Sequence, residues 1–233
     1  IKSQKTEDII NVLLENRGIK TEREKREFFN PTLPTKISVK SLSLSQREID
    51  KAIARIKKAL KTKEKVIVYG DYDADGICAT AILWECLYSL GLNALPYIPE
   101  RFSEGYGLNV ESIKKLKEEN HDLGLIITVD HGIVADKKVD VAKELGIDVI
   151  ITDHHEPGKT KPKALATIHT QKIGGAGVAW IFAREILQKI KKIKLARTVL
   201  ASNASSGLEL VAIGTIADQI PLLGPNRSFV KYG

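Results

Sequence analysis

The chain has 233 residues, of which 43% are hydrophobic and 28% charged, and it carries a formal net charge of +7 at pH 7. This composition excludes disordered and fibrous proteins and is typical of a globular chain with a real core. No apolar run approaches the ~18–20 residues of a membrane span, and the charged, amphipathic N-terminus lacks the apolar centre of a signal peptide. We therefore expect a cytoplasmic protein with no membrane partner.

The positive charge is consistent with a polyanionic partner, although charge alone does not select nucleic acid over other anions. Basic runs at 55–65 and 188–197 are spaced like the solvated faces of helices. Cys78 and Cys86 fall in one predicted helix, too far apart for a local disulfide, so both are expected to be reduced core thiols. Because the chain begins at Ile1 and contains no Met, we interpret it as a fragment or a processed chain.

The N-terminal part of the chain has helical spacing, which "NPTLP" interrupts. The two helical stretches before this break are 6–16 and 22–29. After it, Ser45 opens a strongly amphipathic helix that runs to about Thr62, and Glu48 stands where a capping box needs an acid. We predict that residues 1–62 form a short helical lead-in that packs on the core.

From residue 65 onward, short β-rich runs alternate with helical segments. The β-rich runs are 65–69, 93–98, 123–129, 148–152 and 164–168, and the helical segments between them are 76–90, 109–119 and 134–145. This alternation predicts an α/β fold with a mainly parallel sheet and helices on both faces. In such sheets ligands bind beyond the carboxyl ends of the strands, so the loops at that edge are the place to look for a site.

Acidic and imidazole side chains follow three of these strands. The first strand leads into "GDYDADG", the third into "TVDHG" and the fourth into "TDHHEP", while a further acid stands in "GTIADQIPL" after an apolar helix-like segment. Parallel strand ends lie side by side, so we expect these groups to meet. They are Asp71, Asp73, Asp75, Asp130, Asp153, His154, His155 and Asp218.

Such a cluster of carboxylates would repel itself strongly unless a multivalent cation neutralised it. Oxygen-rich ligand sets with one or two imidazoles favour Mn²⁺ or Mg²⁺ over Zn²⁺. Two ions about 3.5–4 Å apart, bridged by one carboxylate, form the usual clamp for phosphoester hydrolysis. The sequence therefore predicts a two-metal phosphoesterase site.

Each piece also has a simpler interpretation. "DYDADG" resembles a calcium loop, but it follows a strand and lacks the Glu expected six residues after Gly76. Asp130 alone is more often a helix cap, and the His154 and His155 pair alone is equally well a solvated loop or core histidines. Three other histidines have no partners near them in sequence and are not predicted as ligands. They are His121, His131 and His169.

Together the four segments resemble the motifs of the DHH phosphoesterase superfamily, in "VYGDYDADG", "VDHG", "TDHHEP" and "ADQIPL". Within it the chain is most similar to the RecJ single-stranded-DNA-specific exonucleases, through "FFNPTLP", "IPERFSEGYGLN", "GAGVAW" and "IADQIPLLGPNRSFVKYG". The resemblance covers nearly all of the chain from about Lys25. It implies that residues 63–233 form a DHH phosphoesterase domain.

The resemblance implies a nuclease core that takes two Mn²⁺ or Mg²⁺ ions and removes nucleotides from the 5′ end of single-stranded DNA, in DNA repair and recombination. Asp130 matches the bridging ligand, and Asp71 would replace a family histidine that is Tyr69 here. His155 matches the position that contacts the scissile phosphate. The implied metal ligands are Asp71, Asp73, Asp75, Asp130, His154 and Asp218.

Further residues are expected at the substrate. Arg101 would act with His155 and Asp130 in catalysis by offsetting charge on phosphate, and Tyr106 would stack on a base. Gly175 and Gly177 open a helix whose N–H groups would cradle a phosphate or chain terminus, with tight helix packing as an equal alternative.

The chain also departs from the family pattern. The usual Asn-Pro-containing segment reads "IHTQKI" and is shorter, and the chain stops at Gly233, where relatives continue into a domain with a Gly-Gly-His motif. We therefore expect this C-terminal DHH-associated domain to be absent and the activity of the chain to be weak or lost.

Two other functions stay open. One is a DHH phosphoesterase acting on short oligonucleotides, cyclic dinucleotides or polyphosphate, and the other is a non-catalytic replication scaffold derived from RecJ. Every acidic position is filled here, which is untypical of such scaffolds. Single-stranded DNA is the expected partner, with a helicase or a single-strand-binding protein as further candidates. The oligomeric state is not predicted.

Overall fold

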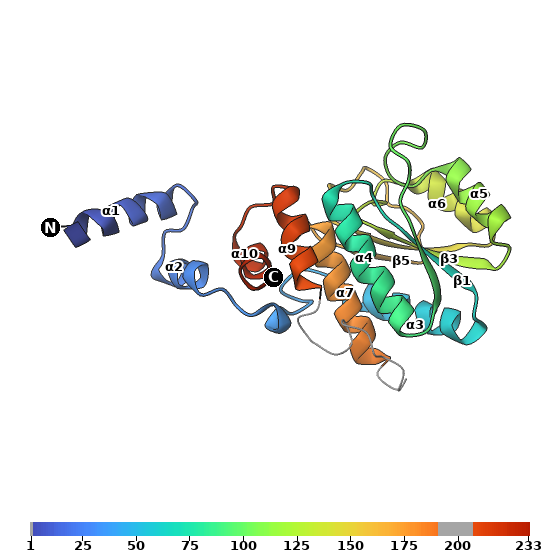
Figure 1. Ribbon diagram of the computed structural model, residues 1–233, viewed down its shortest axis with the longest axis horizontal. Helices are drawn as coiled ribbons and strands as arrows, with labels where there is room; N and C mark the ends of the chain where they lie inside the picture. Colours follow the sequence, from blue (N-terminus) through green and yellow to red (C-terminus); the bar gives the residue numbers. More distant parts are fainter. Residues whose placement is uncertain (1, 191–206) are drawn as a thin grey trace.

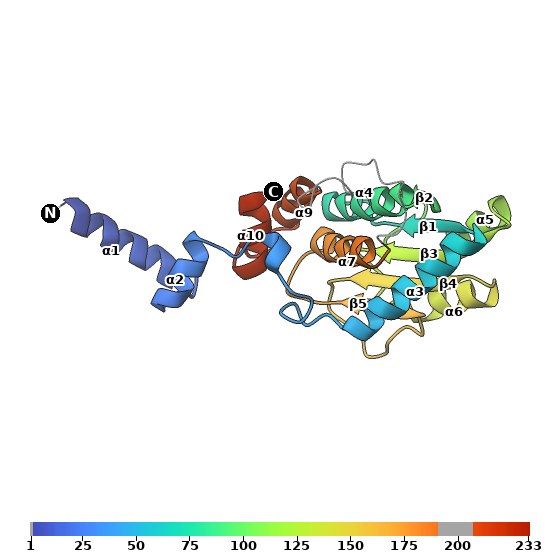
Figure 2. The ribbon, with the colours of Figure 1, turned by 90° about the horizontal axis from the view of Figure 1, so that it is seen from below.

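The computed structural model describes residues 2–190 and 207–233, and a parallel sheet of five strands forms the centre of this part (Figures 1 and 2). The strands are β1 (Lys65–Tyr69), β2 (Asn93–Tyr97), β3 (Leu123–Val129), β4 (Asp148–Asp153) and β5 (Ala166–His169). Their order across the sheet is β2-β1-β3-β4-β5, and each neighbouring pair is parallel. The predicted parallel α/β architecture is confirmed.

Helices cover both faces of this sheet, as predicted. The described helices are α1 (Lys2–Glu15), α2 (Glu22–Phe29), α3 (Gln46–Thr62), α4 (Ala74–Ser89), α5 (Val110–Glu119), α6 (Asp136–Glu144), α7 (Gly175–Lys189), α9 (Leu208–Ala217) and α10 (Gly224–Tyr232). One core lies between the sheet and α3, α4 and α7, and the other between the sheet and α5 and α6. Within the described ranges, no helix has both the length and the apolar character needed to cross a membrane.

Alternate residues of each strand supply the two cores. In β1, Val66 and Val68 pack toward α3, α4 and α7, while Ile67 and Tyr69 pack toward α5 and α6. All four side chains are buried. Because helices cover both faces, the strand is apolar at every one of these positions, and this is the run of β-rich residues visible in the sequence.

Capping side chains fix where two of the helices begin. Ser45 caps α3 as predicted, and its side chain accepts the N–H of Glu48 at 3.4 Å. α4 begins at Ala74, two residues earlier than predicted, because the Asp73 side chain accepts the N–H of Gly76 at 2.8 Å and caps it. The cap makes Asp73 part of both the helix start and the acidic cluster.

The N-terminal lead-in consists of two structurally different parts. α3 belongs to the core, where Ile49, Ile53 and Ile56 are buried. α1 instead projects away from the sheet, and its side chains Ile9 and Leu13 are exposed (Figure 1). Only the α3 part therefore supports the sheet directly.

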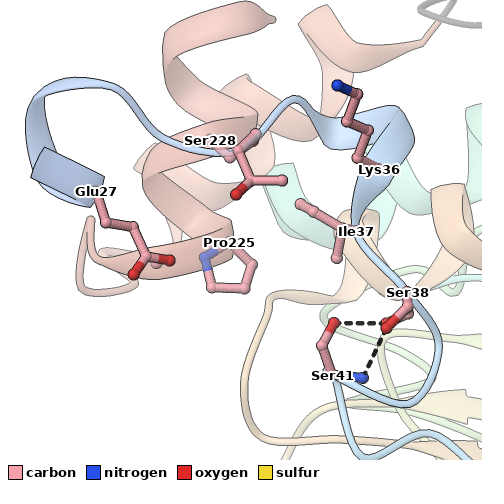
Figure 3. Close-up of a pocket in the computed structure, with 9 residues that line it drawn as sticks. Glu27, Lys36, Ile37, Ser38, Ser41, Pro225 and Ser228 are labelled. Carbon is pink, nitrogen blue, oxygen red and sulfur yellow. Dashed lines mark hydrogen bonds between the residues drawn. The ribbon is translucent and has the colours of Figure 1, made fainter. Parts of the chain in front are cut away.

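An extended segment, residues 28–38, runs between α2 and α3, and we call it the strap. Four side chains of α10 donate hydrogen bonds to its backbone carbonyls: Arg227 to Phe28, Lys231 to Phe29, Tyr232 to Pro31 and Ser228 to Thr32. A cavity of about 370 Å³ lies between the strap and the beginning of α10, with Ile37 and Pro225 in its lining (Figure 3). The strap thus ties the beginning of the described chain to its end.

Arg55 joins α3 to the amino edge of the sheet. Its Nε lies 2.5 Å from Asp148 Oδ2, its Nη2 donates to the carbonyl of Gly124 at 2.8 Å, and its Nη1 pairs with Glu64. Its side chain is only 6% exposed, so this residue of the first basic run is buried, contrary to the predicted solvated face. The second basic run lies largely outside the described residues. The aliphatic stem and planar guanidinium of Arg55 together bridge three elements.

Arg55→Met should lower the free energy of unfolding by about 2–3 kcal/mol, because it leaves two carboxylates without their cation. The loss is smaller than for a fully buried pair, since the Asp148 side chain is 42% exposed. Urea unfolding measures it. Lys58→Met, on the exposed side of the same helix, is the matched control and should change stability by less than about 0.5 kcal/mol. Equal stability of the Arg55 variant and the parent would contradict the bridging role.

Candidate metal centre

Three loops with acidic side chains leave the sheet at its carboxyl edge. Asp71 and Asp73 follow β1, Asp130 follows β3, and β4 ends at Asp153 just before His154. From β1 the chain crosses to β2, and from β3 it crosses in the opposite direction to β4. The loops after β1 and β3 therefore diverge, and a crevice between diverging loops is where open α/β sheets bind ligands.

The side chains predicted as metal ligands come together at this edge in three overlapping sets. Within each set, one candidate ligand atom from every residue lies within 4.8 Å of the others. The sets are Asp71 with Asp73 and Asp130, Asp75 with His154 and Asp218, and Asp130 with His154 and His155. Asp130 and His154 each belong to two sets. Shared ligands of this kind are what a pair of neighbouring ions requires.

Asp130 lies where the sets overlap and has an unusual backbone. Its φ is +67°, in the left-handed region that is strained for a residue with a side chain. Its backbone N–H donates to the carbonyl of Thr152 at 3.0 Å, which holds the residue beside β4. His154 Nε2 lies 3.0 Å from Asp130 Oδ1, but not aligned as a hydrogen bond, so this buried oxygen has no donor. A cation would satisfy it.

Asp75 is held by the first turn of α7. Its Oδ2 accepts the N–H of Gly175 at 2.6 Å, and its Oδ1 accepts the N–H of Ala176 at 3.0 Å. A Cβ on Gly175 would lie 2.2 Å from Asp130 Oδ1, and one on Gly214 would lie 2.2 Å from Asp75 Oδ1. Glycine at these two positions therefore lets α7 and α9 approach the carboxylates closely.

These contacts bear on the two glycines expected to cradle a phosphate. The N–H of Gly175 is engaged by Asp75 instead. A Cβ on Gly177 would lie 3.3 Å from Ile173 and 3.4 Å from Phe229, so this glycine lies against apolar side chains. Both contacts correspond to the tight-packing alternative, and the turn orients a metal-ligand candidate where the sequence suggested a substrate contact.

Burial and crowding shape the electrostatics of the cluster. Burial raises the pKa of Asp71 and Asp75, and it raises that of Asp130 to about 7. Burial opposes the charged form of His154, but the neighbouring Asp130 carboxylate raises its pKa above the usual value. Protons thus relieve the repulsion when no cation is bound, and a multivalent cation would displace them. Carboxylate oxygens with one or two imidazoles fit Mn²⁺ or Mg²⁺.

Asp153 has a different function from the other acids at this edge. Its Oδ1 accepts hydrogen bonds from the N–H groups of His154 and His155 and lies 2.8 Å from His155 Nδ1, while Oδ2 accepts the N–H of Ile133 at 2.8 Å. Burial alone would raise its pKa, but these donors lower it to about 2. In turn the Asp153 carboxylate raises the pKa of His155 to about 9. Asp153 therefore orients His155 and keeps it protonated.

Aromatic side chains extend from His155 along the loop after β2. The Tyr106 hydroxyl lies 3.4 Å from His155 Nε2, and the two rings are 6.0 Å apart. Tyr72, which the sequence analysis did not single out, is 6.4 Å from Tyr106, and Arg101 stacks over its ring at 5.2 Å. The predicted substrate residues Arg101 and Tyr106 thus lie on one continuous strip that begins at the cluster.

The three histidines not predicted as ligands lie outside the ligand sets found among the described residues. His131 is buried, with Nε2 3.0 Å from the carbonyl of Tyr69, and burial lowers its pKa to about 4. His169 Nε2 lies 2.7 Å from the carbonyl of His155 and so supports the loop behind the cluster. The cavity of Figure 3 has none of the predicted ligands in its lining.

Comparison with known families assigns the chain. The family described as "DHH family, N-terminal domain" matches residues 65–215, which include the loops after β1, β3 and β4. The chain therefore belongs to the DHH family, and the resemblance found in the sequence is confirmed.

Relatives within this family are exonucleases of the RecJ type. The chain is 39% identical over 234 residues to the single-stranded-DNA-specific exonuclease RecJ of Bacillus subtilis strain 168, covering 97% of this chain and 27% of the relative. It is similar to a crystal structure of exonuclease RecJ bound to manganese, with a TM-score of 0.69, 37% identity and coverage of 80% of this chain and 47% of that one. For RecJ of Thermus thermophilus in complex with Mn²⁺ the values are 0.69, 32%, 94% and 30%. The chain therefore spans little more than a quarter of the Bacillus relative.

Asp153→Asn should move the pKa of His155 from about 9 down toward its ordinary value, and titration of the imidazole protons by NMR measures it in metal-free protein. Because the folded-state pKa is raised, the pair contributes stability that is complete below about pH 6.5 and is lost as pH rises through about 9. Asp136→Asn on α6 is the control and should leave His155 unchanged. A His155 that titrates near 6.5 in the parent would contradict the assigned pairing.

Mn²⁺ should raise the melting temperature of the parent chain by about 5–10 °C at a hundredfold excess over its dissociation constant. Asp130→Ala should abolish this rise, yet the metal-free variant should melt no lower than the parent, because one of the repelling carboxylates is gone. Asp122→Ala, at the opposite edge of the sheet, should respond to Mn²⁺ as the parent does. Equal Mn²⁺ shifts in the Asp130 variant and the parent would contradict the centre.

Proposed function

We propose that this chain is the catalytic core of a metal-dependent 5′-to-3′ exonuclease that hydrolyses the phosphodiester bonds of single-stranded DNA, in DNA repair and recombination. The observation that carries the proposal is the set of three overlapping ligand groups that share Asp130 and His154. The 39% identity to a RecJ exonuclease supports the substrate class. Because this substrate is the DNA of the cell, the proposed location is the cytoplasm.

The proposed cofactors are two Mn²⁺ or Mg²⁺ ions. When bound, they would neutralise phosphate charge as Lewis acids and supply a water of lowered pKa as the nucleophile. Asp130 would be the shared ligand, because it belongs to two of the sets. The proposed ligands are Asp71, Asp73, Asp75, Asp130, His154 and Asp218.

His155 is the proposed catalytic contact to the scissile phosphate. Asp153 keeps its ring protonated at neutral pH, with a pKa of about 9, and fixes the ring through Nδ1. Nε2 lies on the other side of the ring, and the side chain is 43% exposed. From there a protonated Nε2 would donate a charge-assisted hydrogen bond to a phosphate oxygen that becomes more negative in the transition state.

Arg101 and Tyr106 are proposed to hold the strand next to this contact. Tyr106 is 48% exposed and its hydroxyl lies beside His155, so its ring is available to a base adjacent to the cleaved bond. Arg101 is exposed apart from its contact with Tyr72, and its guanidinium would pair with a phosphate further along. A helicase or single-strand-binding protein as a further partner has no support from the described residues.

A phosphoesterase for short oligonucleotides, cyclic dinucleotides or polyphosphate would use the same centre, so substrate length separates the two functions. Purified chain with Mn²⁺ should shorten 5′-labelled single strands by releasing labelled mononucleotide first, and it should leave blunt duplex intact. EDTA should stop the reaction. Hydrolysis confined to dinucleotides or polyphosphate would contradict the exonuclease proposal.

His155→Gln should lower the hydrolysis rate by about 10²–10³, because it removes a charged donor to the transition state. The variant should retain the Mn²⁺-induced rise in melting temperature, which separates loss of the phosphate contact from loss of the metal centre. His121→Gln, on an exposed turn before β3, is the matched control with unchanged rate. Full activity of the His155 variant would remove it from the mechanism.

A further inference from the structure

The loop after β2 presents an apolar ring to solvent. Phe102 is 94% exposed, more than any other large apolar side chain in the described part of the chain. Neighbouring apolar residues leave the ring uncovered at a position next to Arg101. A phenylalanine so fully exposed gains nothing from folding, which makes its position in the structure informative.

The exposure of Phe102 does not result from a poorly held loop. Both oxygens of Glu104 are hydrogen-bonded: one accepts from the hydroxyls of Tyr97 and Ser112, and the other accepts the N–H of Glu100 at 2.6 Å. Glu100 in turn accepts the N–H of Ser103 at 2.6 Å. These contacts connect the loop to β2 and α5 on both sides of Phe102. The fold therefore supports the backbone and leaves the ring free.

Phe102 also stands at the outer end of the aromatic strip. Its neighbour Arg101 lies over the ring of Tyr72, which contacts Tyr106, which in turn contacts His155. The successive separations are 5.2, 6.4 and 6.0 Å. Alternation of exposed rings with a guanidinium is the pattern that binds single strands, because rings stack on bases while cations pair with phosphates.

We propose that Phe102 stacks on a nucleobase of the bound single strand, several contacts away from the cleaved bond. The inference rests on the proposed function, which it deepens by naming a substrate contact. An exposed ring suits a strand whose bases are free, because the bases of a duplex are already stacked and paired. Phe102 would therefore contribute to the preference for single strands as well as to affinity.

The test compares two strands of equal length, oligothymidylate and a fully abasic strand, with binding measured by fluorescence anisotropy in EDTA so that neither is cleaved. Phe102→Ala should weaken binding of oligothymidylate by about 5- to 100-fold and change binding of the abasic strand little. Phe102→Trp should restore the affinity, and its added fluorescence should be quenched by oligothymidylate. Tyr88→Ala, an exposed ring at the far end of α4, is the matched control and should bind both strands as the parent does.

The possible results separate this inference from the proposed function. If the parent binds and hydrolyses single strands but Phe102→Ala binds oligothymidylate equally well, the stacking role is wrong and the function stands. Equal losses on both strands would show a contribution through charge or folding, and would also overturn stacking. If the parent neither binds nor hydrolyses single strands, the proposed function and this inference both fail.

Discussion

Mutual repulsion of carboxylates at the ends of parallel strands is the constraint on which the rest of this structure depends. Asp71, Asp75 and Asp130 are almost fully buried, and their pKa values are raised because each ionised group lacks water and has acidic neighbours. Such an arrangement is unfavourable for an empty protein. It becomes favourable once multivalent cations are bound, because the cations replace the protons that otherwise hold the group together. The surrounding elements keep the cluster in place against this repulsion.

Three devices provide that support, and each uses backbone atoms. The first turn of α7 donates two N–H groups to Asp75, and the glycines of α7 and α9 permit the close approach. The left-handed backbone of Asp130 places its carboxylate beside β4, at a conformational cost that surrounding contacts maintain. Asp153 takes up the N–H groups of the next two residues and so orients His155. The catalytic edge is therefore preorganised by helix and strand ends as well as by flexible side chains.

Much of this was predictable from the sequence, and the reason lies in the fold class. A parallel sheet brings strand ends to one edge, so residues such as Asp73, Asp130 and His154 could be grouped although they are far apart along the chain. The strands were predictable because burial on both faces leaves a continuous apolar run. The donor of the N–H groups to Asp75 was not predictable, because a glycine-rich helix start looks the same whether it meets a phosphate or a carboxylate. The burial of Arg55 was equally hidden, since its partners Glu64 and Asp148 depend on how α3 packs.

The account is tested most directly by titrating the metal-free chain with Mn²⁺ and following bound ions by electron paramagnetic resonance. Two ions sharing Asp130 should give two bound Mn²⁺ per chain, with a spectrum of exchange-coupled spins rather than isolated ones. Asp130→Ala should lose the coupling, whereas Asp122→Ala should retain it. A single uncoupled ion in the parent, or no binding at all, would contradict the claim that the crowded carboxylates exist to hold a metal pair.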